Sequence, residues 1–264
     1  TPGHSSAASD VYKRQQQTAG NIDDVLEEIL DYQVDGIVLA SVAMSSVLAE
    51  RCDAAGIPVV LFNRAQQEDR FSTVTSDNFA GGKALAEFLV AGGHRRIGYI
   101  AGWEGASTQR DREAGFCAGL AENGHKLFAR GVGDFRTETA ANAARAMFSA
   151  SEFPDAVFVA NDHMAFAVIE ELRGNLGLRV PEDVSVVGYD DVQLSRWSSF
   201  DLTTVRQPSG EMVAETVAAL MAQIEDGETE PRRVKIDGPL VVRGSARRPA
   251  DWKANWKECD DERL

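Results

Sequence analysis

The sequence contains few cysteines and few histidines. Its three cysteines, Cys52, Cys117 and Cys259, are odd in number and far apart, so they form neither a zinc-type pair nor a disulfide framework. The four histidines are equally scattered, and we therefore expect no metal site and no cofactor. This cysteine usage favours a reducing, cytoplasmic setting.

Long apolar runs and positive charge are also scarce. No segment approaches the roughly 20 apolar residues of a membrane helix, and no secretory signal opens the chain, so no membrane partner is expected. The chain has 27 Lys and Arg against 41 Asp and Glu, which gives a net charge of −14. Because phosphate contacts need clustered basic residues, such a chain is a poor nucleic-acid binder by itself.

The signatures of common enzyme classes are absent. Gly81-Gly82-Lys83 lacks the first glycine and the Ser or Thr of a phosphate loop, and Gly131-Val132-Gly133 stands outside the context of a dinucleotide fingerprint. No GxSxG nucleophile elbow occurs. These absences favour a binding protein, and we expect no enzyme activity.

Strand-like and helix-like patterns alternate along the chain, whose 264 residues suit one or two domains. Short apolar runs predict buried strands, and apolar residues spaced by three and four predict the helices between them. This alternation indicates an α/β fold with parallel sheets. We expect strands at about 36–40, 57–62, 73–75, 97–101, 156–160, 184–189, 202–205 and 239–243, and helices at about 22–30, 47–55, 79–89, 109–122, 137–150, 164–172 and 209–225. A variable segment precedes Asp134-Phe135.

Polar residues follow several of these strands. The run 157–160 ends in Asn161, and the run 184–189 ends in Asp190. In an open parallel sheet, ligands bind at the carboxyl ends of the strands. The residues at the expected strand ends are Ser41, Asn63-Arg64, Trp103, Asn161-Asp162 and Asp190-Asp191. Their hydroxyl, amide and carboxylate groups suit a sugar or a nucleoside.

Such a pocket also needs an aromatic plane and a fixed guanidinium group, for which Phe135 and Arg112 are candidates. Each candidate has a plainer interpretation. Asn161 could cap the following helix, and Asp190-Asp191 could form a turn. Arg112 could pair with a surface acid, and Phe135 could belong to the core. The residue pattern leaves these alternatives open.

Both ends of the chain fall outside the regular pattern. Thr1–Gln15 has no periodicity, and Asp10–Gln15 resembles a translated transposon-end sequencing adapter. Residues 1–17 are therefore predicted to be a non-native or disordered leader. The tail 250–264 holds two tryptophans and several acids, and it is predicted to be a surface extension.

Seven segments carry a more specific signal. They are Val74–Gly81, Gly93–Gly102, Arg112–Phe116, Ala160–Ala165, Asp183–Asp191, Leu202–Pro208 and Leu240–Ser245. In this order and spacing they resemble the LacI/GalR family of bacterial transcriptional regulators. The resemblance covers about Asn21 to Pro249, and its specificity comes from the whole set of segments.

The resemblance implies a two-lobed, periplasmic-binding-protein-like α/β fold with parallel sheets. It places crossovers near Thr75-Ser76, Gln207-Pro208 and Lys235–Asp237. The first lobe is then 18–75 plus 208–234, and the second lobe is 76–207 plus 235–249. Against the family's pattern the first lobe is N-terminally truncated, and the helix-turn-helix that reads operator DNA falls outside this chain. Loss of a central strand exposes sheet edges, so we expect the chain to be poorly stable alone.

In the family, a small-molecule effector lies between the lobes. By position, the resemblance implies that Asn161, Asp190 and Arg112 hold the polar groups of the effector. It also implies that Phe135 stacks on the effector and that Gln207 contacts the effector or the hinge.

The resemblance adds two residues from the first lobe. Asn63 stands where many relatives have aspartate, and Ser41 is a looser match. Because an amide can donate a hydrogen bond where a carboxylate only accepts, Asn63 implies a different hydroxyl pattern in the effector.

The implied mechanism is allosteric. Effector binding, with a sugar favoured over a purine, closes the lobes and shifts a homodimer between arrangements with different operator affinity. The effector must bind these arrangements unequally. The dimer face is expected on the helix after Pro208 and around Met44–Ala55.

Two other functions remain as alternatives. A secreted solute-binding protein of a sugar transporter would share the fold, and an α/β enzyme is a third candidate. The motifs Gly188–Asp191, Leu202–Pro208 and Leu240–Arg243 look more like those of regulators.

Overall fold

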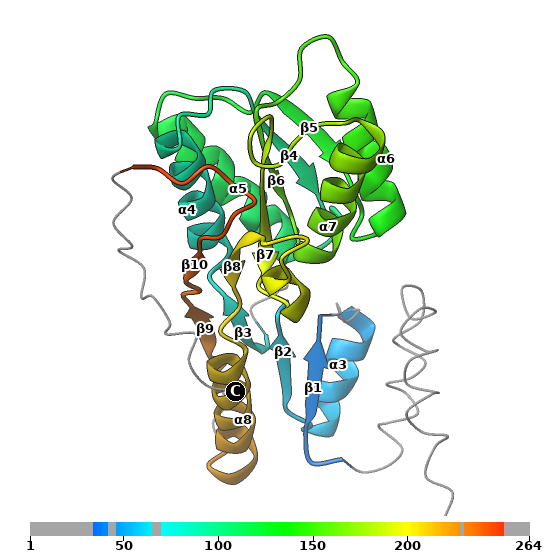
Figure 1. Cartoon of the computed structure of the whole chain (residues 1–264). Coiled ribbons are helices and arrows are strands. Elements are labelled where there is room, and N and C mark those ends of the chain that lie inside the picture. Colours follow the sequence, from blue (N-terminus) through cyan, green and yellow to red (C-terminus); the bar gives the residue numbers. More distant parts are fainter. Residues whose placement is uncertain (1–33, 42–45, 65–69, 228–229, 251–264) are drawn as a thin grey trace, which may run out of the picture. The chain divides into compact units, whose positions relative to one another are not determined.

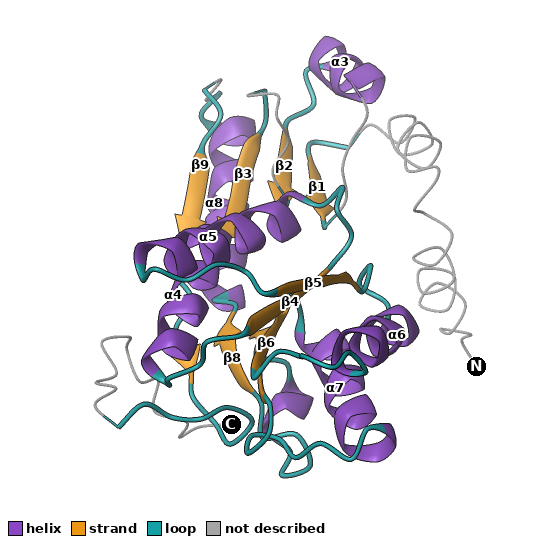
Figure 2. Cartoon of the chain, turned by 90° about the horizontal axis from the view of Figure 1, so that it is seen from above, coloured by secondary structure: helices purple, strands orange, loops and turns teal. Residues whose placement is uncertain are grey.

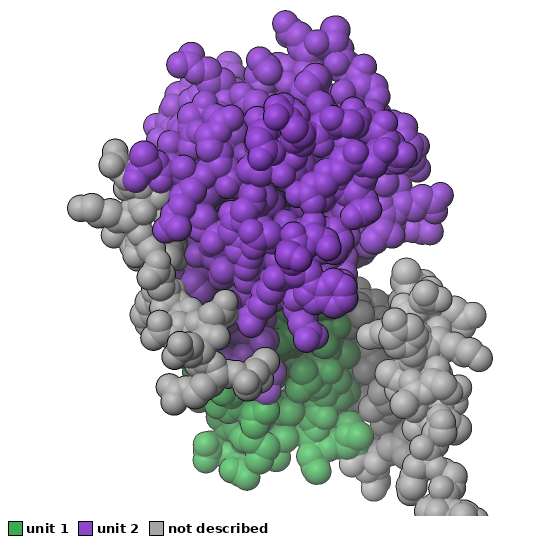
Figure 3. All heavy atoms as spheres, viewed as in Figure 1, with its two compact units in different colours: residues 1–74, 214–233 green, residues 75–213, 234–264 purple. Residues whose placement is uncertain are grey.

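The computed structural model describes residues 34–41, 46–64, 70–227 and 230–250. The predicted leader, the predicted helix 22–30 and the predicted tail lie outside these residues. The chain divides into two compact units, which Figure 3 draws in different colours. Unit 1 holds the described residues up to Val74 together with those of Ala214–Arg233, and unit 2 holds Thr75–Val213 together with those from Val234 onward. In this described part, no helix is long and apolar enough to cross a membrane.

Unit 2 is built on a six-stranded sheet with the strand order β10-β8-β7-β6-β4-β5. All neighbouring pairs are parallel except β10 with β8. The strands are β4 (Ile97–Ala101), β5 (Ala129–Val132), β6 (Ala156–Val159), β7 (Ser185–Asp190), β8 (Thr203–Arg206) and β10 (Leu240–Val241). The central strands β4 and β6 are buried along their whole length, as parallel strands covered on both faces must be.

Helices cover both faces of this sheet. Figure 1 shows α4 (Asn78–Ala91) and α5 (Ser107–Glu122) on one face, and α6 (Thr137–Phe148) and α7 (Asp162–Glu170) on the other. A π-helical turn, Glu171–Asn175, continues α7, and a 3-10 turn, Gln193–Arg196, follows β7. Beneath α5, the rings of Tyr99, Phe116 and Phe158 form one aromatic cluster, with centroids 5.0 to 5.8 Å apart.

Glycines allow α4 and α5 to pack closely. A Cβ atom on Gly115 would lie 2.0 Å from the carbonyl oxygen of Phe79, and one on Gly82 would lie 2.2 Å from that of Arg112. Both neighbours are backbone atoms, so neither helix could make room without moving as a whole. The Gly81-Gly82 pair, which superficially resembles a phosphate loop, therefore sets the position of the α5 backbone at Arg112.

Unit 1 has a smaller sheet. Figure 2 shows its strands side by side in the order β1-β2-β3-β9, with β1, β2 and β3 parallel. The elements are β1 (Ile37–Ala40), α3 (Ser46–Ala55), β2 (Val59–Phe62), β3 (Ser72–Ser76), α8 (Ser209–Glu225) and β9 (Arg233–Ile236). Helix α8 begins in unit 2 and continues into unit 1, and β3 and β9 also cross the boundary along the chain.

The part of the unit 1 core that the structure describes is small. A buried cluster joins α3 to one face of the sheet and consists of Ile37, Leu39, Ala49, Cys52, Val59, Leu61 and Phe71. On the other face, a Cβ atom at Gly36 would lie 2.8 Å from a side-chain atom of Leu220, which shows how closely α8 approaches β1. Among the described strands, β1 is an edge strand, and its Val38 is exposed.

The predicted α/β class with parallel sheets is confirmed, and the strand-helix alternation holds wherever the chain is described. Two strands were missed. The variable segment contains β5, and β9 lies where only a crossover was expected. Asp77, rather than Asn78, caps α4, because its carboxylate accepts a hydrogen bond from Ala80 N at 2.9 Å.

Candidate functional site

Arg112 is buried and held by several contacts in unit 2. It projects from α5, is 3% exposed, and its guanidinium carbon lies 3.7 Å from the centre of the Tyr189 ring. Its Nε donates to Asn78 Oδ1 at 2.8 Å, and its Nη1 donates to Ala160 O at 2.6 Å. Arg112 does form an ion pair, with Asp190, but its guanidinium group is buried against the sheet at the ends of β6 and β7 and does not lie on the surface.

Asp190 receives the third bond of this guanidinium group. Arg112 Nη2 donates to Asp190 Oδ1 at 3.2 Å, and Gln207 Nε2 donates to the same oxygen at 2.6 Å. Among the described residues, no hydrogen bond occupies Asp190 Oδ2. The carboxylate is partly exposed, at 21%. Its second oxygen is therefore available to accept hydrogen bonds from a ligand's hydroxyl groups.

Gln207 is bound to Asp190 by its backbone as well as by its side chain. Its backbone N–H donates to Asp190 O at 3.2 Å. Because β7 and β8 pair in parallel with Asp190 opposite Arg206, Gln207 stands at the carboxyl end of β8. The structure thus brings together three of the predicted site residues, Arg112, Asp190 and Gln207.

Asn161 lies at the same edge of the sheet and caps α7. Its Oδ1 accepts a hydrogen bond from Met164 N at 3.0 Å, and the preceding carbonyl, Ala160 O, accepts the bond from Arg112. The capping interpretation is correct. Because Oδ1 makes the cap, the Asn161 side chain can contact a ligand through its amide nitrogen, Nδ2.

Phe135 follows β5 and packs against the core of unit 2. Its ring lies over Gly102, where a Cβ atom would be 2.2 Å from the ring. This contact needs a glycine at the end of β4 and fixes the plane of the ring. The core interpretation therefore holds for part of the side chain, which is half-buried, and its stacking on a ligand stays a prediction.

Strained backbone is concentrated at the strand ends. Of the described non-glycine residues with positive φ, all but Asp201 follow or end a strand; they are Ser41, Asn63, Asp134, Phe135, Asp190 and Asp191. The left-handed region costs about 1–3 kcal/mol for such residues and persists only where the surroundings impose it. At the carboxyl edges of both sheets, the backbone therefore adopts strained conformations that set the directions of these side chains.

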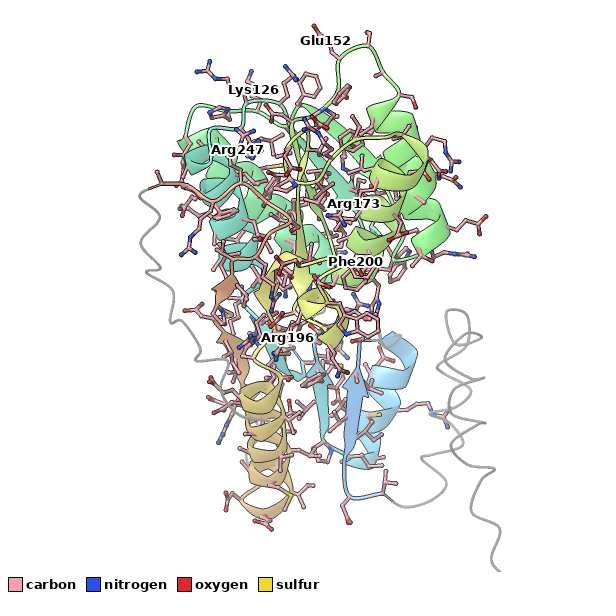
Figure 4. All side chains as sticks on the ribbon, viewed as in Figure 1. Lys126, Glu152, Arg173, Arg196, Phe200 and Arg247 are labelled. Atoms are coloured by element: carbon pink, nitrogen blue, oxygen red, sulfur yellow. The ribbon has the colours of Figure 1, made fainter. Side chains whose placement is uncertain are left out.

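Asp191 points away from this site. Its buried carboxylate pairs with Arg206 Nε at 2.5 Å and Arg243 Nη2 at 2.6 Å. A third arginine, Arg196, labelled in Figure 4, lies 3.9 Å away. A buried carboxylate shared between arginines is structural, so the two adjacent acids divide their roles, with Asp190 facing the site and Asp191 fixing the turn.

Asp162 was predicted only as one of the polar residues at the strand ends, and the structure shows that it supports the site from the buried side. Its buried carboxylate accepts from Thr204 Oγ1 at 2.7 Å, Ser195 Oγ at 2.7 Å and Val192 N at 3.0 Å. It therefore ties α7 to β8 and to the turn after Asp191. Burial, together with the nearby charge of Asp190, raises the pKa of Asp162 to about 6.

Asn78 and Tyr189, which hold the Arg112 guanidinium group, were also missed. Neither residue was predicted to take part in the site, although Asn78 lies in the segment Val74–Gly81 and Tyr189 in the segment Asp183–Asp191. For Tyr189, the available signal was the Gly188-Tyr189-Asp190-Asp191 motif. No local pattern predicts the contact of Asn78 with Arg112, because it joins positions 34 residues apart.

Ser41 and Asn63 lie together in unit 1. They follow β1 and β2, and Asn63 Nδ2 approaches Ser41 Oγ at 3.5 Å, the limit of a hydrogen bond. Ser41 O also accepts from Arg64 Nη2 at 2.7 Å. Asn63 Oδ1 is buried without a hydrogen-bond partner among the described residues. Their role in ligand binding stays a prediction.

Metal chemistry has no candidate centre in the described residues, where no group of three His, Cys, Asp or Glu side chains converges. The arrangement in unit 2 is instead a set of hydrogen-bonding groups at a sheet edge, supported from behind by a stacked arginine. Such an arrangement suits recognition of a small polar molecule.

Comparisons with known proteins agree with this geometry. Residues 86–246 match the family described as "Periplasmic binding protein-like domain". The chain is 36% identical over 216 residues to the HTH-type transcriptional regulator CelR of Thermobifida fusca. This match spans 80% of the present chain and 63% of CelR. The chain is also 30% identical over 236 residues to the HTH-type transcriptional repressor PurR of Photobacterium profundum. This match spans 87% of the present chain and 70% of PurR.

Solved structures are similar as well. The transcriptional regulator CelR-cellobiose complex has a TM-score of 0.77 and 34% identity, with 83% of this chain and 69% of that chain covered. A LacI transcriptional regulator from a Rhodococcus species has a TM-score of 0.76 and 27% identity, with 84% and 82% covered. These relatives are transcriptional regulators rather than transport proteins or enzymes. The chain therefore belongs to the periplasmic-binding-protein-like family, among the LacI-type transcriptional regulators.

Proposed function

We propose that this chain is the effector-binding part of a LacI-type transcriptional regulator and that its effector is a sugar. The observation that carries the proposal is the arrangement of Asp190, whose Oδ1 is held by Arg112 and Gln207 while no described residue hydrogen-bonds to Oδ2. A carboxylate oxygen fixed in this way accepts hydrogen bonds from vicinal hydroxyl groups without any cost of ordering its side chain.

The chemistry of the neighbouring groups supports a sugar. Asn161 follows β6, the strand next to β7, and its amide nitrogen does not take part in the cap. The sheet edge therefore offers a donor as well as the Asp190 acceptor, and sugar hydroxyls can use both. Phe135 offers an aromatic ring at the same edge. CelR has been solved with cellobiose, which makes a β-linked glucoside the first ligand to test.

We further propose that the regulator works as a homodimer. Helix α8 carries an exposed apolar stripe, with Val213, Val217, Met221 and Ile224 spaced by three and four residues. An exposed stripe of this kind marks an interaction surface, and in a LacI-type regulator a second copy of the chain fits it best. The other predicted part of the dimer face includes Met44, which lies outside the described residues.

The remaining parts of the proposal concern the whole protein. The effector changes operator affinity by binding two arrangements unequally, and operator contact belongs to a helix-turn-helix segment, as the names of the HTH-type relatives suggest. The role is binding rather than catalysis, and the setting is the cytoplasm. The closure of two lobes around the effector, and contacts from Ser41 and Asn63, are further predictions.

Isothermal titration calorimetry tests the ligand. Cellobiose, ribose and hypoxanthine are titrated into the wild-type chain and into Asp190→Asn, with the partly exposed Asp183→Asn as a matched control in the same unit. A sugar should bind the wild type and the control equally, and Asp190→Asn should weaken binding about 10–100-fold, because hydrogen bonds to charged groups contribute about 1.5–3 kcal/mol. Absence of binding by either sugar, or unchanged affinity in Asp190→Asn, would contradict the proposal.

Sedimentation velocity tests the dimer. Val217→Glu places a charge in the α8 stripe, whereas Glu215→Lys changes charge at another exposed position of the same helix. The first variant should shift the chain toward monomer, and the second should not. A monomeric wild-type chain at micromolar concentration would contradict the proposed dimer.

A further inference from the structure

We infer that Trp103 is a second aromatic surface of the effector site and that it selects an effector of at least two sugar rings. This inference rests on the proposed function and adds the size class of the ligand. Trp103 follows β4 at the carboxyl edge of the unit 2 sheet, and it is 50% exposed. A large aromatic ring left open to water beside a ligand-binding edge loses free energy that a ligand's apolar face can recover.

The loop that carries Trp103 is held at three points. Gly102 N donates to Gln109 Oε1 at 2.7 Å, and Gly105 O accepts from Arg110 Nη1 at 3.1 Å. Glu104 Oε1 accepts from Arg130 Nη2 at 2.7 Å. These bonds tie the loop to α5 and to β5. The exposed indole therefore stands on a preorganised loop rather than on a loose one.

Gly105 provides the seat of the indole ring. A Cβ atom at this position would lie 2.4 Å from the ring, so the indole rests directly on the glycine backbone. Glu113, which binds both Gln109 and Arg130, supports the same loop from below. A ring seated on one side keeps its other side for contact, which is the geometry that stacking on a sugar requires.

The sheet order gives the size of the ligand. Asp190 ends β7 and Trp103 follows β4, and β6 lies between these two strands. Neighbouring strands are about 4.8 Å apart, so the loops after β7 and β4 are about 10 Å apart. A single pyranose ring that binds Asp190 does not span this distance, whereas a disaccharide does. Trp103 therefore contacts the second ring and leaves the first to Asp190 and Arg112.

The experiment compares one-ring and two-ring probes. Glucose and cellobiose are titrated calorimetrically into the wild type, Trp103→Ala, Trp103→Phe and Gly105→Ala. Trp197→Ala is the matched control, because Trp197 is 58% exposed on a different loop of unit 2. Thermal unfolding confirms that each variant is folded. Indole fluorescence of wild type and Trp103→Phe, with and without cellobiose, gives a second readout.

The expected pattern is specific. Trp103→Ala should weaken cellobiose about 10–100-fold and glucose less than twofold, Trp103→Phe should retain most of the affinity, and Trp197→Ala should change nothing. Gly105→Ala should weaken cellobiose while keeping the indole, because it displaces the ring. The cellobiose-induced fluorescence change should vanish in Trp103→Phe.

Equal cellobiose affinity in the wild type and Trp103→Ala, with Asp190→Asn impaired, would overturn this inference alone. Failure of the wild type to bind any sugar would overturn the proposed function and this inference with it.

Discussion

The two units support their strand ends differently. In unit 2, Asp190 is bound by a buried arginine that is itself stacked on Tyr189 and bonded to Asn78 and Ala160. In unit 1, the corresponding pair is Ser41 and Asn63, joined by one long contact of 3.5 Å. One buried amide oxygen of Asn63 has no hydrogen-bond partner among the described residues.

The difference extends to the cores behind these edges. Unit 2 has an aromatic cluster and helices on both faces of a six-stranded sheet. The described core of unit 1 is a small cluster beneath α3, and β1 is an edge strand there. A site is only as fixed as its supporting shell, so unit 2 carries the preorganised part of the ligand site. Three predictions test this comparison.

The largest effect should come from the α4–α5 packing of unit 2. In Gly115→Ala, the new methyl group meets the backbone oxygen of Phe79, and overpacking against backbone costs about 3 kcal/mol or more. We expect a loss of that size in urea unfolding and weaker effector binding, because α5 carries Arg112. Gly210→Ala is the control, because nothing lies within 4 Å of its added methyl group. Equal stabilities of the two variants would remove the basis for calling unit 2 rigid.

Unequal stability of the two units should be seen in hydrogen exchange. We expect amides of β1 and β2 to exchange at least tenfold faster than those of β4 and β6, because the buried apolar cluster among the described residues of unit 1 is much smaller than that of unit 2. Peptide-resolved mass spectrometry measures this. Thiol labelling adds a probe, since burial raises the pKa of Cys52 and labelling requires opening. A single cooperative transition with equal protection in both units would break the comparison.

A smaller effect should come from Asp162. Its pKa is raised from the usual 3.8 to about 6 in the folded protein, so between these values the folded chain holds a proton that the unfolded chain has lost. Stability should therefore fall by about 2 kcal/mol as pH rises from 4 to 6, and this group should add no further change above that.

The control for this pH dependence is a variant pair. In Asp162→Asn the fall between pH 4 and 6 should be absent when urea unfolding is compared with the wild type. Asp183 has the opposite sign, because its hydrogen bonds to Arg179 lower its pKa to about 2, so its contribution grows as pH rises toward 4. Replacing Asp183 should therefore leave the fall in stability between pH 4 and 6 unchanged. Parallel pH curves for the wild type and Asp162→Asn would show that Asp162 stays ionised.

Most elements could be predicted because their residues carry local signals. Buried parallel strands such as β4 and β6 are continuous apolar runs, and helices show their spacing and caps. The missed strands are different. β5 reads Ala-Arg-Gly-Val and β9 reads Arg-Val-Lys-Ile, and both carry exposed charged residues. Edge strands of this kind are defined by pairing with distant residues and lack an apolar run of their own.

The sequence predicted which residues form the site better than it predicted the contacts that hold them. The family motifs gave Arg112, Asp190 and Gln207, which the structure joins by hydrogen bonds. They could not give the role of Asn78, because its bond to Arg112 depends on the crossing of α4 and α5. The buried network of Asp162 was missed for a similar reason, since its donors come from two segments distant in sequence, the turn after β7 and strand β8.

The shared oxygen of Asp190 has a consequence beyond binding strength. Gln207 holds Asp190 Oδ1, and two residues later the chain enters α8, which leads out of unit 2 and into unit 1. A ligand hydroxyl on Oδ2 binds the same carboxylate group that anchors Gln207 through Oδ1. Any shift of this carboxylate on ligand binding is therefore passed to the backbone segment that enters α8.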